Sequence, residues 1–158
     1  MKKILVVASG GGHVDQAIAV LPCLHGAHVE LATYAGIVTP TMETVAVNKI
    51  HRMFLWGEVI GPKLAFSLCV NFLQFLFLLV TRRPEVILST GSEMAIPAFL
   101  IGRCLPGTIL IHLETAIRVH DLSLSGKVLL RLSNHFFVQW PKLEEKYKGK
   151  VRYIGRIF

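Results

Sequence analysis

Short apolar runs alternate with helical segments along almost the whole chain. Runs such as Ile4 to Ala8 contain no polar alternation, which is typical of strands covered on both faces. Such strands, separated by helices, require a parallel sheet with helices on either side. The sequence therefore predicts an α/β fold of the Rossmann-like, doubly wound class. Strands are expected near 3–8, 28–34, 50–55, 86–88, 108–113, 136–139 and 151–154, and helices near 14–24, 63–81, 92–104 and 124–132.

The length of 158 residues fits one domain, and the chain shows no internal repeat, low-complexity tract or linker. A single domain over residues 1–158 is predicted. The hydrophobic content of 53% is high for a soluble domain. We therefore expect contact with lipid or with a protein partner.

The net charge of +7 comes from 17 Lys and Arg residues against 10 acidic ones. This excess suits an anionic membrane surface or phosphorylated substrates. Nucleic acid is not expected, because no basic run is interleaved with aromatics and no zinc-finger or RNP pattern occurs. The basic residues gather near the end of the chain, at Lys142, Lys146, Lys148, Lys150, Arg152 and Arg156.

The three cysteines, Cys23, Cys69 and Cys104, are odd in number and lie in apolar surroundings. They are interpreted as reduced core thiols. No metal-ligand spacing and no cofactor motif are found. The first apolar run is too short for a signal-peptide core, so folding is expected to begin in the cytoplasm.

A run of three glycines, Gly10, Gly11 and Gly12, joins the first strand to the first helix and is flanked by Ser9 and His13. Glycines allow a sharp turn and a close approach of the backbone to a ligand, and a helix N-terminus favours anions. The run predicts a site for a pyrophosphate or another anion, with His13 as a possible general base. A plain structural turn would use the same glycines.

Thr90, Gly91, Ser92 and Glu93 form a second strand-to-helix connection of small and polar residues. They are candidate substrate-binding residues. Ser92 could instead serve only as the cap of a helix whose first turn carries Glu93.

A third polar group follows the strand near 108–113. Glu114 is a candidate general base or sugar-hydroxyl acceptor. Arg118 could bind phosphate or simply pair with Glu114, and His120 could lie in a solvated loop. The role of His112, within the strand, stays open at this point.

The segment 64–80 carries seventeen residues without a charge, between Lys63 and the pair Arg82-Arg83. Its length is at the bottom of the range that crosses a bilayer. Crossing would also separate the first strands from the strand near 86–88 on which they should pair. A helix lying on the membrane is favoured over a span and over a helix buried against the core or a partner.

The same helix carries a polar stripe at helical spacing. Apolar residues lie elsewhere on it, an arrangement that suits an interface. The stripe comprises Ser67, Asn71, Gln74 and Thr81, and the apolar set Phe66, Phe72, Leu73, Phe77 and Leu79.

Taken in order, these motifs resemble the PssD-type polysaccharide biosynthesis subunits. That family is similar to the eukaryotic membrane-anchoring subunit of the dolichol-linked N-acetylglucosamine transferase, and more distantly to the N-terminal half of MurG-type GT-B glycosyltransferases. The resemblance is carried by residues 9–13, 89–93, 111–118, 123–127, 138–141 and 154–158.

The resemblance implies a single N-terminal-type GT-B half-domain, acting as the acceptor-side, membrane-recruiting subunit of a two-chain inverting glycosyltransferase. A small PssE-type subunit would hold the UDP-sugar, and the acceptor would be a polyprenyl-pyrophosphate saccharide. The implied pathway is extracellular or capsular polysaccharide synthesis, by hexosyl or glucuronosyl transfer. The implied location is the cytoplasmic face of the membrane, with monotopic attachment. Because the chain starts directly at a strand, attachment is expected to rest on residues 63–83.

By the same resemblance, His13 would deprotonate the acceptor hydroxyl or hold its pyrophosphate. The family's carboxylate and arginine correspond to Glu114 and Arg118. Partner contacts are expected at Gln139, Trp140, Pro141 and Phe158.

Two other functions fit the sequence. A non-catalytic subunit could dock and activate a separate catalytic partner at the membrane. A stand-alone nucleotide-binding module would have to bind UDP or a dinucleotide tightly by itself.

Overall fold

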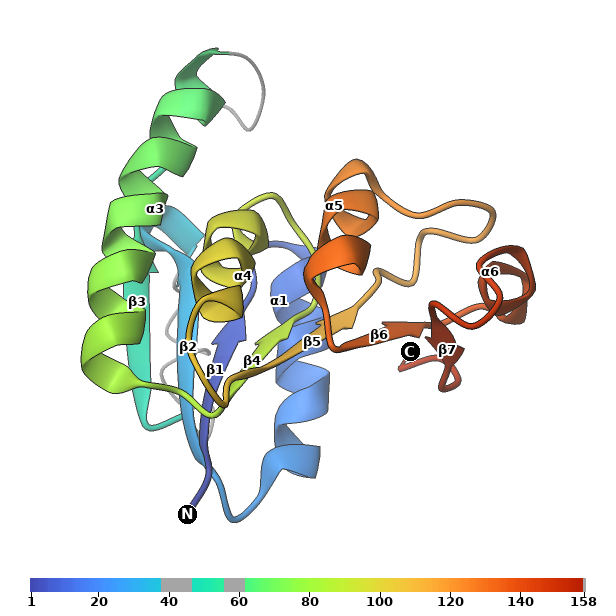
Figure 1. Cartoon of the computed structure of the whole chain (residues 1–158), viewed down its shortest axis with the longest axis horizontal. Helices are drawn as coiled ribbons and strands as arrows, with labels where there is room; N and C mark the ends of the chain where they lie inside the picture. Colours follow the sequence, from blue (N-terminus) through green and yellow to red (C-terminus); the bar gives the residue numbers. More distant parts are fainter. Residues whose placement is uncertain (38–46, 56–61, 158) are drawn as a thin grey trace.

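The computed structural model describes residues 1–37, 47–55 and 62–157. Their centre is a seven-stranded sheet in the order β3-β2-β1-β4-β5-β6-β7, in which every pair of neighbours is parallel (Figure 1). The strands are β1 (Lys3–Val7), β2 (His28–Tyr34), β3 (Lys49–Met53), β4 (Val86–Ser89), β5 (Ile109–Leu113), β6 (His135–Val138) and β7 (Arg152–Tyr153).

The helices cover both faces of this sheet. Helices α3, α4 and α5 pack on one face, and α1 packs on the other (Figure 1). Their bounds are α1 (Gly12–Val20), α3 (Pro62–Arg82), α4 (Ala95–Arg103), α5 (Leu124–Leu132) and α6 (Pro141–Lys146), with short 3₁₀ turns η1 (Leu21–Leu24) and η2 (Ala35–Ile37). The doubly wound α/β fold is confirmed.

Alternation along β1 shows how the two layers of the core form. Leu5 and Val7 point into the layer beneath α3, α4 and α5, whereas Ile4 and Val6 point into the layer beneath α1. All four are buried, which explains why the run is apolar without interruption.

The strand order reverses direction next to β1. The chain builds β1, β2 and β3 outward, and α3 then carries it back so that β4 pairs with the other side of β1. In sheets of this kind ligands bind at the carboxyl ends of the strands, beside this reversal. The loops after β1 and β4 meet there.

Helix α3 turns part of its polar stripe toward the core, which the sequence did not predict. Ser67 and Asn71 are fully buried, and Leu79, which was placed away from the polar stripe, is buried as well. The outer surface is instead apolar, with Leu73 66% and Phe77 74% exposed.

Residues 65–82 of α3 are long and apolar enough to cross a membrane, judged by length and composition alone, with a mean hydropathy of 1.7. The helix nevertheless packs on the sheet through Phe75, Leu78 and Leu79. It also connects the ends of two strands of one sheet, so a span would pull these side chains out of the core.

The predicted core location of the cysteines is wrong. Cys23, Cys69 and Cys104 are free thiols, but all three are exposed. Cys69 lies on α3, Cys104 directly follows α4, and Cys23 lies in the η1 turn. The prediction of one domain over 1–158 includes residues outside the described ranges and stays a prediction.

The two phenylalanines Phe75 and Phe77 test the orientation of α3. Phe75 is fully buried and Phe77 is exposed. We expect Phe75→Ala to lower the free energy of unfolding by about 3–5 kcal/mol, because it leaves a cavity in the core. Phe77→Ala should change it by less than about 0.5 kcal/mol. Urea unfolding of both variants in one detergent provides the measurement, and equal losses would contradict this orientation.

Candidate functional site

The glycine loop lies between the carboxyl end of β1 and the start of α1. The Thr33 hydroxyl, near the end of β2, donates to the Ser9 carbonyl oxygen at 3.2 Å and anchors the loop. Gly11 has a φ of +54°, and its carbonyl oxygen accepts from the amides of Val14 and Asp15. The loop is thereby joined to the first turn of α1.

The space above the loop is open. Gly11 and Gly12 are exposed, and a Cβ built on either residue meets no atom within 4 Å. Backbone amides at a helix N-terminus carry a partial positive charge, so this surface can receive an anionic group. The geometry therefore agrees with the predicted anion site, which stays a prediction.

His13 and Thr90 form two hydrogen bonds across the reversal of strand order. The Thr90 hydroxyl donates to the His13 carbonyl oxygen at 2.7 Å, and His13 Nδ1 lies 3.0 Å from the Thr90 carbonyl oxygen. A carbonyl oxygen can only accept, so neutral His13 carries its proton on Nδ1. Nε2 is left with a lone pair, which is the state that a general base needs.

Gly91 makes this contact possible. Its φ is +120°, and a Cβ at this position would lie 2.5 Å from both Nδ1 and Cε1 of His13. The imidazole therefore packs directly against the Gly91 backbone. Ser92 follows with a φ of 90°, which is unusual for a residue other than glycine. Its strained backbone helps to turn the chain beneath His13.

The capping role predicted for Ser92 is only partly correct. Its hydroxyl accepts from the Met94 amide at 3.1 Å, but α4 begins at Ala95, so Glu93 precedes the helix. The Glu93 carboxylate instead accepts a hydrogen bond of 2.9 Å from the Tyr34 hydroxyl. Burial and this carboxylate raise the pKa of Tyr34 far above its usual range.

A depression of about 660 Å³ lies beside His13. The first turns of α1 form one wall, and the chain just beyond Glu114 forms the other. The lining residues are Gly12, His13, Asp15, Gln16, Thr115, Ala116 and Ile117.

Glu114 is fully buried, and its carboxylate is occupied by hydrogen bonds within the chain. Oε2 accepts from the Ser123 amide at 3.2 Å and from its hydroxyl at 3.1 Å, and Oε1 accepts from the Thr115 amide at 3.1 Å. Burial raises the pKa of Glu114, while these hydrogen bonds oppose the shift. The contacts favour a positioning role over the predicted general base.

Arg118 and His120 are both exposed. Within the described ranges, Arg118 forms no ion pair with Glu114, although its charge lowers the pKa of that carboxyl. The alternative of a simple Glu114–Arg118 salt bridge is therefore not observed, and Arg118 directly follows Ile117, which lines the depression.

Of the residues after β6 that were predicted to contact a partner, Gln139 is buried, whereas Trp140 and Pro141 lie nearer the surface. Gln139 is buried, which makes a direct partner contact wrong for its side chain. Its amide nitrogen donates to Gln16 Oε1 and to the Glu114 carbonyl oxygen, while its oxygen accepts from the Ile157 amide. Gln139 thus joins α1, the strand end of β5 and the C-terminal segment.

Trp140 and Pro141 lie nearer the surface. Trp140 Nε1 donates to the Ala116 carbonyl oxygen at 2.6 Å, and the Arg156 guanidinium lies 5.1 Å from the Trp140 ring centroid. Pro141 is exposed at the start of α6. Phe158 lies outside the described residues.

Two buried polar residues were missed or left open by the sequence. Gln16 on α1 donates to the Thr115 hydroxyl at 3.2 Å and fixes the far wall of the depression. His112 is buried between Phe99 and Phe136, and among the described residues neither ring nitrogen has a hydrogen-bond partner. Burial lowers the pKa of His112 to about 3, so this side chain is neutral.

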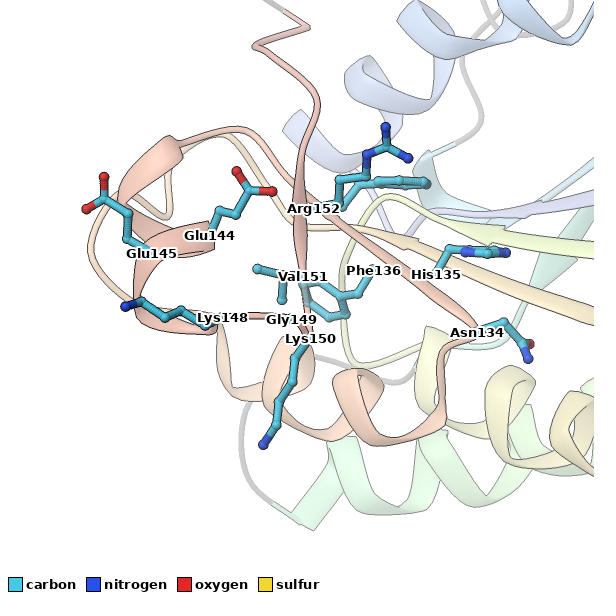
Figure 2. A pocket seen from close by; sticks show the side chains of 11 residues that line it. Asn134, His135, Phe136, Glu144, Glu145, Lys148, Gly149, Lys150, Val151 and Arg152 are labelled. Carbon is cyan, nitrogen blue, oxygen red and sulfur yellow. The ribbon is translucent and has the colours of Figure 1, made fainter.

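A second cavity, of about 630 Å³, lies at the opposite edge of the sheet, where β6 and β7 begin (Figure 2). The cavity is lined by side chains of either charge, including Glu144, Glu145, Lys148 and Lys150. Ligands of parallel sheets bind at the carboxyl edge, so the depression beside His13 is the better candidate. Across the described ranges, no group of three or more His, Cys, Asp or Glu side chains is arranged to hold a metal ion.

The sequence comparisons agree with this geometry. A family described as "oligosaccharide biosynthesis protein Alg14 like" matches residues 62–157, which is more than half of the chain. The UDP-N-acetylglucosamine transferase subunit ALG14 of Mus musculus is 44% identical over 181 residues, covering 98% of this chain and 82% of the relative. The chain belongs to the Alg14-like family.

Two further matches are to parts of longer proteins. A pyrophosphoryl-undecaprenol N-acetylglucosamine transferase of Streptococcus pyogenes is 22% identical over 74% of the chain, which spans 30% of that relative. The crystal structure of Acinetobacter baumannii MurG superposes with a TM-score of 0.73 at 18% identity, covering 89% of this chain and 42% of that chain. The fold of the Alg14-like chain is thus that of a GT-B half-domain.

Gly91→Ala tests the His13 contact in this Alg14-like chain. The added methyl group would meet the imidazole at 2.5 Å, so we expect His13 to lose its hydrogen bond to Thr90. Nitrogen-15 NMR of labelled histidine reports the tautomer. The unaltered chain should show neutral His13 protonated at Nδ1, and Gly91→Ala should give a mixture. Gly12→Ala, which meets no atom within 4 Å, is the control and should preserve the Nδ1 form.

Proposed function

We propose that the chain is the acceptor-side, membrane-recruiting subunit of a two-chain inverting glycosyltransferase. The observation that carries the proposal is His13 at the reversal of strand order, with Nδ1 bonded to the Thr90 carbonyl oxygen and open space around Gly11 and Gly12 next to it. The relatives are named as subunits of a UDP-N-acetylglucosamine transferase, which supports a separate partner and UDP-N-acetylglucosamine as the first donor to test.

The acceptor is a saccharide on polyprenyl pyrophosphate. The glycine loop suits the pyrophosphate, because its amides and the α1 N-terminus favour an anion. The printed name of the Streptococcus pyogenes relative, a pyrophosphoryl-undecaprenol glycosyltransferase, supports the same acceptor chemistry. Ser9, Thr90, Gly91, Ser92, Glu93 and Arg118 complete the proposed substrate-binding set.

Transfer would proceed by a single displacement. The acceptor hydroxyl oxygen attacks the anomeric carbon of the UDP-sugar, and a glycosidic bond forms. The bond from that carbon to UDP breaks, and its electron pair leaves with UDP. The hydroxyl proton passes to His13 Nε2, while the Thr90 carbonyl oxygen stabilises the imidazolium through Nδ1.

Membrane recruitment is assigned to α3. Its outer surface is apolar, it ends at Arg82 and Arg83, and the chain carries a net charge of +7. An apolar surface with basic flanks suits an interface that contains anionic lipid. Because the inner surface of α3 is part of the core, we propose monotopic attachment, on the cytoplasmic face.

The finer predictions from the sequence are kept as proposals. These are the PssD-type assignment, the PssE-type partner, hexosyl or glucuronosyl transfer, and a role in extracellular or capsular polysaccharide synthesis. A panel of UDP-sugars tested with the assembled complex would identify the donor.

The first experiment compares sugar transfer in membranes by this chain alone and by this chain together with its donor-binding partner. We expect activity only with both chains. His13→Ala in the complex should lower kcat by about 10²- to 10⁴-fold, the usual contribution of a general base. His25→Ala is the control, since His25 is exposed and its ring forms a local hydrogen bond to the Pro22 carbonyl oxygen. If His13→Ala leaves kcat unchanged, the chain is the non-catalytic recruiting subunit instead.

Glu114→Gln separates positioning from proton transfer. If Glu114 only holds Ser123 and Thr115, the amide keeps one acceptor oxygen and kcat should fall less than about tenfold. The KM for the acceptor should rise, because the wall of the depression loosens. A fall in kcat as large as that of His13→Ala, with unchanged KM, would show that Glu114 is the base.

A further inference from the structure

The loop 114–123, between β5 and α5, has neither helix nor strand but is fixed at both ends. Glu114 accepts hydrogen bonds from Ser123, which joins the two ends of the loop. The Trp140 indole N–H donates a hydrogen bond to the Ala116 carbonyl oxygen, and the Gln16 side-chain amide donates one to the Thr115 hydroxyl. These contacts from α1, the start of α5 and the residue before α6 hold the loop in one position.

Asp121 anchors the other half of the loop. Its carboxylate accepts from the Tyr147 hydroxyl at 2.5 Å, from Lys127 Nζ at 2.7 Å and from Lys146 Nζ at 3.1 Å. Lys146 Nζ also donates to the His120 carbonyl oxygen at 3.2 Å. Each exposed ion pair is weak alone, but together they attach the loop to α5 and α6.

Ile117 stands out in this fixed loop because it is 79% exposed. An exposed isoleucine contributes little to the free energy of folding. Because its position is already fixed, less entropy is lost when it binds a ligand. It lies on the wall of the depression opposite His13 and Asp15, next to the exposed Arg118. The depression thus offers a base and glycine amides on one side and an aliphatic side chain on the other.

We propose that Ile117 binds the isoprenoid chain of the lipid-linked acceptor at the end that carries the pyrophosphate. The inference rests on the proposed function, since it assumes a prenyl pyrophosphate acceptor. A branched aliphatic side chain matches isoprene units and offers nothing to a sugar hydroxyl. The adjacent Arg118 guanidinium matches the pyrophosphate oxygens. Ile117 therefore distinguishes a prenyl acceptor from a water-soluble one.

The test compares Ile117→Ser with Leu124→Ser. Leu124 is a matched control, because it is 83% exposed, begins α5 and does not line the depression. Both variants are assembled with the partner in detergent and assayed on two acceptors. One is the saccharide on polyprenyl pyrophosphate, and the other is the same saccharide pyrophosphate with a methyl group in place of the prenyl chain.

We expect Ile117→Ser to raise the KM for the prenyl acceptor about tenfold, through loss of buried aliphatic surface, with unchanged kcat. Its KM for the methyl acceptor should not change, and Leu124→Ser should change neither value. Equal KM effects on both acceptors, equal effects of both variants, or loss of the co-purifying partner in Ile117→Ser would each overturn the prenyl contact.

The proposed function fails differently. If the unaltered complex transfers sugar to neither acceptor, the glycosyltransferase proposal is overturned together with the prenyl contact. If the unaltered complex transfers sugar, and if it, Ile117→Ser and Leu124→Ser show the same KM for the prenyl acceptor, only the prenyl contact is overturned.

Discussion

The candidate site depends on the two hydrogen bonds between His13 and Thr90. They connect the loops that follow β1 and β4, which are neighbours in the sheet but far apart in the chain. The bonds set the tautomer of His13 and the position of the glycine loop at once. Every proposed contact with an acceptor depends on the position of this pair, because His13 itself lines one side of the depression.

Much of the fold could be predicted from sequence because parallel strands are buried on both faces. Runs such as Ile4 to Val7 have no other stable location, and all seven expected strands are present. The glycine run predicted an anion site at the carboxyl edge, and that site stays a prediction. Helix α6 was missed, because a polar turn of helix that buries only Leu143 leaves almost no periodic signal.

The rest of the site follows from tertiary contacts that no local pattern encodes. Gln16 and Gln139 resemble surface residues in sequence, yet each is buried because it satisfies polar groups of other elements. Asn71 is fully buried beside Tyr34, and the direction of the polar stripe on α3 could not be read from its spacing. Glu114 looked like a free base because Ser123 is nine residues away in the chain.

The packing of α3 on the sheet has a geometric consequence. The same sheet carries α3, the helix proposed to lie on the membrane, and the loops after β1 and β4. Helix α3 is joined to β4 by the short connection at Arg83 to Glu85. With α3 resting on a bilayer, the height of His13 above the lipid is fixed by the width of a protein layer. Under the proposed attachment, the pyrophosphate end of an acceptor would have to rise to that height above the lipid before its terminal hydroxyl could meet His13.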